Sequence, residues 1–267
     1  MPTPPPREAA RAPVVAFALA VAAGAAACGG PPPAPAVHRA VATSEGFSSI
    51  ETDDLDVVVR LGFAHQVSLR CDPERAPYAR VEVVGDVLRA EMRDEPLRLL
   101  QAGDRPCAID VYMPSLRSVR SEGSGDVRVI GAAEGLQSVA LDGSGDARFD
   151  DASGEEPRFS LSGSGDLWLR RLQARRAEFS LSGSGDVDVR DGAVAAARLR
   201  SSGSGDVNAR SLVVDSAEVR ASGSGNVEVT ARRRAELDVS GSGDVVVSGG
   251  PADCRARSSG SGSARCR

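Results

Sequence analysis

The sequence contains no lysine, so all 32 basic residues are arginine, and only two of its 267 residues are histidine. Aromatic residues make up 3% of the chain. The formal net charge is −5, and acidic and basic residues are interspersed. A basic stripe with interleaved aromatics is therefore missing, and we expect no nucleic-acid partner. Since 41% of the residues are apolar, the chain can build a core, but mostly from valine, leucine and alanine.

Catalytic and metal-ligand patterns are also missing from the sequence. The histidines are His38 and His65, and no cysteines have the spacing of a zinc site. There is no Ser/His/Asp set, no phosphate loop between a strand and a helix, and no paired carboxylates outside the repeats. The acidic cluster Asp53, Asp54 and Asp56 is interpreted as a solvated strand end. Because catalysis needs unlike groups converging in one cleft, we predict no enzyme activity, no cofactor and no metal.

The N-terminus is typical of an export signal. Two arginines precede an apolar stretch, Val14–Ala27, that is too short to span a bilayer as a mature helix. An ordinary signal peptide would be cleaved at the end of this stretch. A cysteine at the cleavage point, followed by a Gly/Pro-rich segment, favours a bacterial lipoprotein signal instead. We predict a signal peptide (1–27), a tether (28–45) and a membrane attachment through several acyl chains on Cys28.

Four further cysteines in an exported chain predict two disulfides, for which three pairings are formally open. Their grouping along the sequence favours Cys71–Cys107 and Cys254–Cys266. The second pair lies six residues on either side of the last repeated glycine, Gly260. We therefore expect this bond to close the final repeat, where a stack of repeats would otherwise expose its core.

A four-residue phrase, Gly-Ser-Gly-Asp, dominates the C-terminal half of the chain. Its copies are twenty residues apart, except for the last two, which follow at eighteen and nineteen residues. A constant period in this range is typical of an array in which each repeat stacks on the next. The first glycines of the phrase are Gly123, Gly143, Gly163, Gly183, Gly203, Gly223, Gly241 and Gly260.

Apolar residues recur at fixed distances from each phrase. The positions four before, four after and six after the first glycine are apolar in every copy, as in Phe179, Val187 and Val189, with mostly polar residues between them. This alternation predicts a strand on each side of every phrase. We expect the glycines to adopt positive φ at a tight corner, and the following Asp or Asn to bond nearby amides.

The segment before the repeats also has strand-like patterns. They are found at 55–61, 66–71, 79–84, 87–92 and 108–113.

Two architectures fit the repeats, namely coils of a solenoid or meandering antiparallel sheets. The segments opposite the glycine corners are irregular, and twenty residues give about 66 Å of path, enough for one flattened turn of a β-helix. We predict an all-β, single-stranded β-helix of about eight coils of about 20 residues (119–267). A smaller β-rich N-terminal part (46–118) precedes it.

The recurring acids of the phrase are the candidate binding residues. In a solenoid they would form a ladder at about 5 Å spacing, so neighbouring charges must be solvated, bonded to turn amides or bridged by a cation. Calcium is the weaker alternative, because one carboxylate per coil is far fewer than the six to eight oxygens it takes. The ladder consists of Asp126, Asp146, Asp166, Asp186, Asp206 and Asp244, with Asn226 and Ser263 in the two remaining coils.

With these features in place, residues 46–266 resemble bacterial proteins of the auto-transporter adhesin, head GIN domain family. The resemblance rests on the run of Gly-Ser-Gly-Asp turns, the strand Ile109–Pro114 before them, and Val57–Leu61 and Val81–Val84 upstream. It implies a β-helical fold shaped like pectate lyases without their catalytic residues, and a role in adhesion at the cell surface. The lipoprotein-like start and the four further cysteines depart from that pattern.

The sequence therefore predicts an exported, non-catalytic protein of the bacterial outer membrane or periplasm that binds a surface ligand, either a glycan or a protein. Two alternatives stay open at this point. A carbohydrate-active enzyme would need arginine and aspartate converging in a cleft. A periplasmic structural or sensory module would bind one partner protein.

Overall fold

The structure is a computed structural model that describes residues 37–41, 46–93 and 107–267. The predicted signal peptide and Cys28 lie outside these residues. One short 3-10 helix, η1 (Ala76–Tyr78), accompanies the strands. The strands are β1 (Val37–Val41), β2 (Ser49–Asp53), β3 (Asp56–Leu61), β4 (Gln66–Cys71), β5 (Ala79–Val84), β6 (Val87–Met92), β7 (Ala108–Met113), β8 (Ser118–Glu122), β9 (Val127–Glu134), β10 (Ser138–Leu141), β11 (Ala147–Gly154), β12 (Arg158–Leu161), β13 (Leu167–Leu181), β14 (Val187–Val189), β15 (Gly192–Ser201), β16 (Val207–Ala221), β17 (Val227–Val239), β18 (Val245–Ser248), β19 (Asp253–Ser258) and β20 (Ala264–Cys266).

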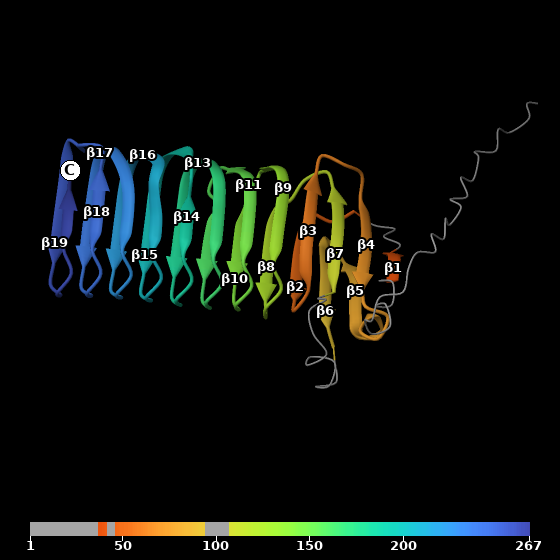
Figure 1. The fold of residues 1–267 in the computed structure, drawn as a ribbon. Helices are drawn as coiled ribbons and strands as arrows, with labels where there is room; N and C mark the ends of the chain where they lie inside the picture. The colour runs from red at the N-terminus through yellow and green to blue at the C-terminus, as the bar shows by residue number, and fades with distance from the viewer. Residues whose placement is uncertain (1–36, 42–45, 94–106) are drawn as a thin grey trace, which may run out of the picture. The chain divides into compact units, whose positions relative to one another are not determined.

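The repeats form a parallel β-solenoid, as predicted, and the meandering antiparallel alternative is wrong for them (Figure 1). Each turn has one strand before its glycine corner and one after it. We call the two faces the pre-corner sheet, which includes β8, β10, β12 and β19, and the post-corner sheet, which includes β9, β11, β14, β18 and β20. The long strands β13, β16 and β17 bend from the post-corner sheet of one coil into the pre-corner sheet of the next.

The strands pair in the register that the repeat predicts. Val139 is paired with Val119 on one side and Phe159 on the other, each twenty residues away. The solenoid has about seven turns, slightly fewer than the eight predicted. Eight corners enclose seven intervals, which accounts for the difference.

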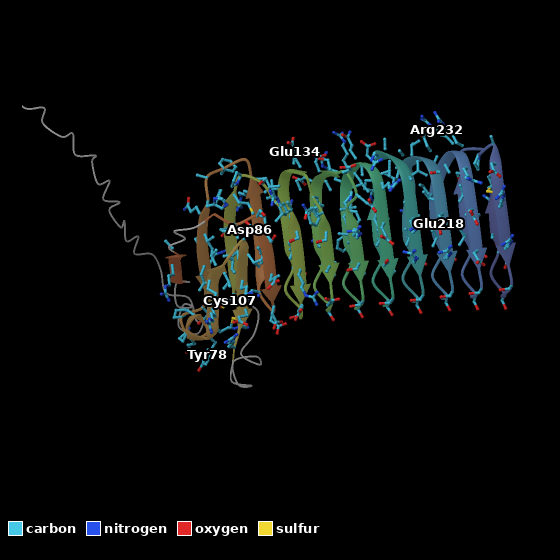
Figure 2. All side chains as sticks on the ribbon, turned by 180° about the vertical axis from the view of Figure 1, so that it is seen from behind. Tyr78, Asp86, Cys107, Glu134, Glu218 and Arg232 are labelled. Atoms are coloured by element: carbon cyan, nitrogen blue, oxygen red, sulfur yellow. A yellow bond between two sulfur atoms is a disulfide. The ribbon has the colours of Figure 1, made fainter. Side chains whose placement is uncertain are left out.

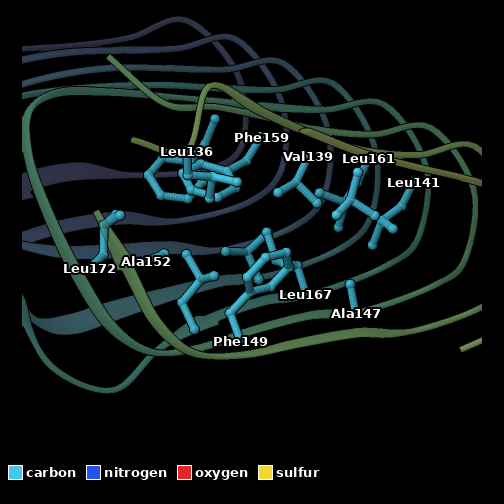
Figure 3. Packing of buried hydrophobic residues seen from close by; sticks show 14 of the residues in the cluster. Leu136, Val139, Leu141, Ala147, Phe149, Ala152, Phe159, Leu161, Leu167 and Leu172 are labelled. Atoms are coloured by element: carbon cyan, nitrogen blue, oxygen red, sulfur yellow. The ribbon is translucent and has the colours of Figure 1, made fainter. Parts of the chain in front are cut away.

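The predicted core positions point inward and are buried (Figure 3). Phe159 and Phe179 stack with ring centroids 4.8 Å apart. This distance matches the spacing between coils, so aromatic rings at equivalent positions of neighbouring coils can stack. The last coil differs, because Ala256 is exposed and Ala264 is only half-buried. In the part of the chain that the structure describes, β19 and β20 have a neighbouring coil on one side only. Small residues there reduce the apolar surface left in water.

The glycine corners are tight for a different reason from the predicted one. Of the first glycines of the eight phrases, only Gly123 has a positive φ, of 79°. A Cβ added to Gly183 would instead lie 1.8 Å from the carbonyl oxygen of Gly163, and one added to Gly185 would lie 2.0 Å from that of Gly165. The residue must therefore be glycine because the backbones of consecutive coils are in direct contact.

The predicted strands before the repeats are confirmed, and they join the same stack. β2 lies between β6 and β8, and β3 lies between β7 and β9, all in parallel. The coil β2–β3 thus comes first in the sequence but is enclosed on both sides. Beyond it, β4, β5 and β1 pair antiparallel with their neighbours. These strands cover an edge that would otherwise expose unpaired backbone groups.

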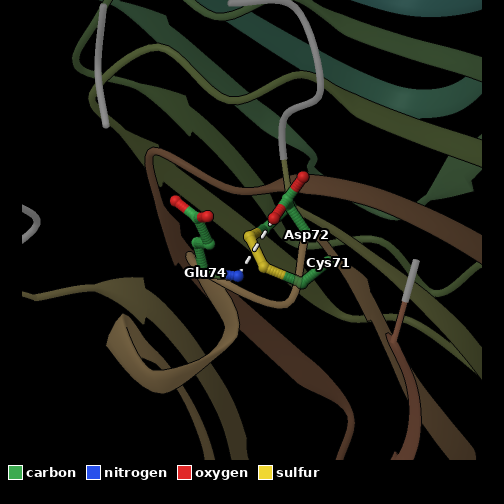
Figure 4. The surroundings of a disulfide bond; sticks show 4 residues. Cys71, Asp72 and Glu74 are labelled. Carbon is green, nitrogen blue, oxygen red and sulfur yellow. Dashed lines mark hydrogen bonds between the residues drawn. A yellow bond between two sulfur atoms is a disulfide. The ribbon is translucent and has the colours of Figure 1, made fainter. Parts of the chain in front are cut away.

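Both predicted disulfides are present. Cys71–Cys107 joins β4 to the residue before β7, and both cysteines are buried. Beside it, the Asp72 carboxylate accepts the amide of Glu74 at 3.0 Å, which forms the turn that leads to η1 (Figure 4). Cys254–Cys266 joins β19 to β20 and so closes the final coil.

We predict that Gly183→Ala lowers the free energy of unfolding by about 2 kcal/mol or more, because the new methyl group overlaps a backbone carbonyl that cannot move alone. Chemical denaturation followed by circular dichroism measures the change. Ser184→Ala is the matched control, since Ser184 lies in the same corner and is exposed. Equal denaturation midpoints for the two variants would contradict the role given to backbone contact.

Candidate functional site

The predicted aspartate ladder forms a chain of hydrogen bonds between coils. At each step, a side-chain oxygen accepts the backbone N–H of the equivalent residue in the next coil, at 2.7 to 3.0 Å. Asp186, for example, receives the amide of Asp206 at 2.7 Å. Bonding to turn amides, one of the alternatives predicted for these carboxylates, is observed.

The substitutions within the ladder follow the same chemistry. Asn226 keeps a side-chain carbonyl, which accepts the amide of Asp244 at 3.0 Å. Its amide group donates to Asp206 at 3.2 Å. The hydroxyl and backbone N–H of Ser263 both donate to Asp244, and these bonds lower the pKa of the Asp244 carboxyl, with a smaller contribution from Arg265. The ladder thus uses one oxygen per residue to hold the corners together.

The acidic cluster of the first coil belongs to the same system. Asp54 accepts both the backbone N–H and the hydroxyl of Ser124, at 2.8 and 2.9 Å. Asp56 accepts the amide of Asp126 at 3.0 Å. Partial burial raises the pKa of Asp53, and the nearby acids, led by Asp54, raise it further. Among the described residues, no group of three or more His, Cys, Asp or Glu is arranged to hold a metal ion.

The outer face of the pre-corner sheet carries a groove of about 550 Å³. Sequence reasoning missed it, although the sequence carries a signal: a serine directly precedes the first glycine in six consecutive coils, and five of these serines line the groove. We call it the serine groove. It is also lined by Arg200, Arg220 and Asp238. The five serines of this series that line it are Ser162, Ser182, Ser202, Ser222 and Ser240, all exposed.

Three hydroxyls of the serine groove, those of Ser162, Ser182 and Ser202, donate hydrogen bonds to the preceding coil. Ser162 donates to Asp142 at 2.7 Å, and Ser202 donates to the carbonyl of Leu181 at 3.3 Å. A hydroxyl that donates inward keeps its lone pairs for a ligand. At a coil spacing of about 4.8 Å, five serines extend about 19 Å. The groove therefore offers regularly spaced acceptors, together with arginine donors, along the solenoid axis.

A second groove, of about 430 Å³, runs beside the first and has charged walls. Its floor is made of small residues, among them the buried Ala177, Ala197 and Ala217. Arg198 lies between Glu178 and Glu218 of the neighbouring coils, and it pairs with Glu218 at 2.9 Å. Figure 2 shows Glu218 on this outer face, whereas Glu134 and Arg232 lie at the edge opposite the glycine corners. Opposite charges directly across neighbouring strands stabilise the sheet.

Of the two histidines, His65 takes part in a structural contact with Phe47, before β2. His65 Nε2 lies 3.2 Å from the backbone nitrogen and 2.8 Å from the backbone oxygen of Phe47, and the two rings are in contact at 4.7 Å. A helix with the length and hydropathy of a membrane span is not found among the described residues.

We predict that Asp186→Ala destabilises the fold by about 1 kcal/mol, because the amide of Asp206 loses its acceptor. Asp186→Asn keeps a carbonyl at this place, as Asn226 does naturally, and is expected to cost less. Thermal unfolding at neutral pH compares the two. If the asparagine variant were as unstable as the alanine variant, the charge and not the hydrogen bond would be the stabilising feature.

A family model described as putative auto-transporter adhesin, head GIN domain, matches residues 46–251. No curated protein matches the chain. Several solved structures share its fold, and three of them are the following. A putative lipid binding protein from Parabacteroides distasonis is 22% identical, covers 88% of this chain and 97% of its own, and has a TM-score of 0.78. A putative adhesin from the same organism is 18% identical (87% and 97% coverage, TM-score 0.74). A putative adhesin from Parabacteroides merdae is 16% identical (88% and 97% coverage, TM-score 0.70).

At these identities the solved structures establish the likeness of fold alone. The family model, in contrast, matches most of the chain, from the residues before β2 to the turn after β18. It includes the enclosed coil β2–β3 and seven of the eight glycine corners. The chain therefore belongs to the auto-transporter adhesin, head GIN domain family.

Proposed function

We propose that this protein is a non-catalytic binding protein of the bacterial cell envelope that attaches to an extended surface ligand through the outer face of its solenoid. Family membership and two disulfides support an exported or surface location. A lipid anchor on Cys28 would hold the solenoid at the outer membrane or in the periplasm. The part of the predicted tether (28–45) that precedes β1 would give it reach.

The serine groove is the observation that carries this proposal. It repeats the same acceptor in five coils, so it suits a ligand that itself repeats along its length, such as a glycan strand or an extended peptide. A ladder of identical groups does not create the single convergent centre that catalysis requires. Its two arginines already form ion pairs, Arg200 with Glu178 and Arg220 with Glu218, which orient their remaining donors.

A glycan array with the purified full-length protein separates the functional classes. Bound sugar that is recovered unchanged supports adhesion, whereas shortened products would support the alternative of a carbohydrate-active enzyme. Capture of a single envelope protein in a pull-down, with no glycan bound, would favour a periplasmic structural or sensory module.

We predict that Ser202→Tyr weakens ligand binding about tenfold or more, because a bulky ring would fill the middle of the groove. Ser202 is exposed, so the substitution leaves the core intact. Ser204→Tyr in the corner of the same coil is the matched control, since Ser204 is equally exposed and lies outside the groove. Binding of the array ligand, measured by biolayer interferometry, should fall for the first variant only. If both variants weakened binding equally, or if neither changed it, the groove would not be the binding site.

A further inference from the structure

The chain's single tryptophan lies on the outer face of the post-corner sheet, in the outward positions that alternate with the core residues. Trp168 is half-buried between two inward residues, Leu167 and Leu169, that are fully buried. It belongs to a row in which each residue pairs with its equivalent in the next coil. We call this the tryptophan row. It consists of Arg148, Trp168, Asp188 and Asn208.

One side of the indole is fixed by an arginine. The guanidinium carbon of Arg148 lies 4.2 Å from the centroid of a Trp168 ring, within cation–π distance. Arg148 is itself paired with Asp146 at 3.3 Å. Within the described residues, this guanidinium is the one charged group or ring stacked on the indole. The contact holds the ring in place and leaves its second face without an aromatic or cationic partner.

The next residue in the row carries an unsatisfied hydrogen-bond acceptor. The Asp188 side chain is 15% exposed, and its Oδ2 pairs with Arg190 at 2.6 Å. Its Oδ1 is buried and has no hydrogen-bond partner. A buried carboxylate oxygen without a donor carries a desolvation cost, which is relieved when the side chain turns that oxygen toward a donor. Asn208, one coil further, is exposed and can both donate and accept.

We propose that the tryptophan row is a subsite for one neutral pyranose ring of a glycan. The apolar C–H face of the sugar would lie against the face of Trp168 that Arg148 does not cover, and its hydroxyls would bond the Asp188 carboxylate and the amide of Asn208. Trp168 and Asn208 are two coils apart, or about 10 Å, which leaves room for a ring above the short side chain of Asp188. An aromatic platform beside a few polar groups is a combination that fixes both the position and the orientation of a ligand.

This inference rests on the proposed function only in taking the protein to be a non-catalytic binding protein. The tryptophan row and the serine groove are on different sheets, so either site can be wrong without the other. A purely structural role for Trp168 makes a different prediction. In that case, the indole and Asp188 would stabilise the coil but would not respond to sugar.

The single tryptophan provides a direct measurement, since all tryptophan fluorescence of the chain comes from this row. The full-length protein is titrated with hexasaccharides of glucose, mannose, N-acetylglucosamine and xylose up to about 10 mM, where even weak millimolar binding is visible. We expect a saturable change in emission with at least one of them. Asp188→Asn should weaken that binding about tenfold or more, because a charged acceptor becomes neutral.

Two controls make the outcome decisive. Arg128→Ala, which lies one coil before the tryptophan row and two coils from Trp168, should leave the titration unchanged. Trp168→Ala, made in the Ser202→Tyr background so that the serine groove does not contribute and followed by calorimetry, should bind no sugar while its thermal unfolding still shows a folded protein. No saturable change with any of the four sugars, or equal affinities for the wild-type and Asp188→Asn proteins, would overturn the inference. Ser202→Tyr separates the two sites, because loss of array binding with an unchanged tryptophan titration concerns the serine groove alone.

Discussion

The contact between consecutive glycine corners is the constraint on which the other features of the solenoid depend. A carbonyl oxygen of one corner lies where the next corner would carry a Cβ, and the same oxygen accepts an amide from that corner, as Gly163 does from Ser184 at 2.9 Å. Backbones this close can pair in one register only. Once that register is set, the apolar positions fall into inward rows, and the serines, the ladder acids and the tryptophan row fall into outward rows. The surface pattern is thus a product of the corner.

Much of this fold could be predicted from the sequence, because the signals are local or periodic. The twenty-residue spacing, the apolar positions around each phrase and the cysteine grouping were sufficient for the solenoid, the core rows and both disulfides. The edge opposite the corners was less visible. Leu136, Leu172 and Leu212 are buried there, but they lie in segments whose lengths and compositions vary. The expected positive φ of the glycines was wrong, since a local turn argument takes no account of a neighbouring coil.

The candidate sites differ in how well they could be predicted from the sequence. The ladder acids were found, and their hydrogen-bonding role was among the alternatives. The serines of the serine groove recur in the sequence, but the groove itself was not predicted, because its hollow depends on the three-dimensional packing. The adjacency of Trp168 and Asp188 follows directly from the repeat, whereas the unsatisfied oxygen of Asp188 depends on how Arg190 folds back. Periodicity therefore predicts which residues are neighbours, but the depth of a groove and the satisfaction of a polar atom need the three-dimensional packing.

The enclosed position of the β2–β3 coil affects the order in which the protein can assemble. This coil is made first by the ribosome, yet both of its neighbours consist of strands that appear later, β6 and β7 on one side and β8 and β9 on the other. Such non-local pairing is slow, because the chain loses the entropy of closing a long loop before the strand pairing contributes stabilising free energy. Assembly would therefore start from within the stack. Coils would then be added one after another toward the C-terminus, while the antiparallel strands cover the other end of the stack.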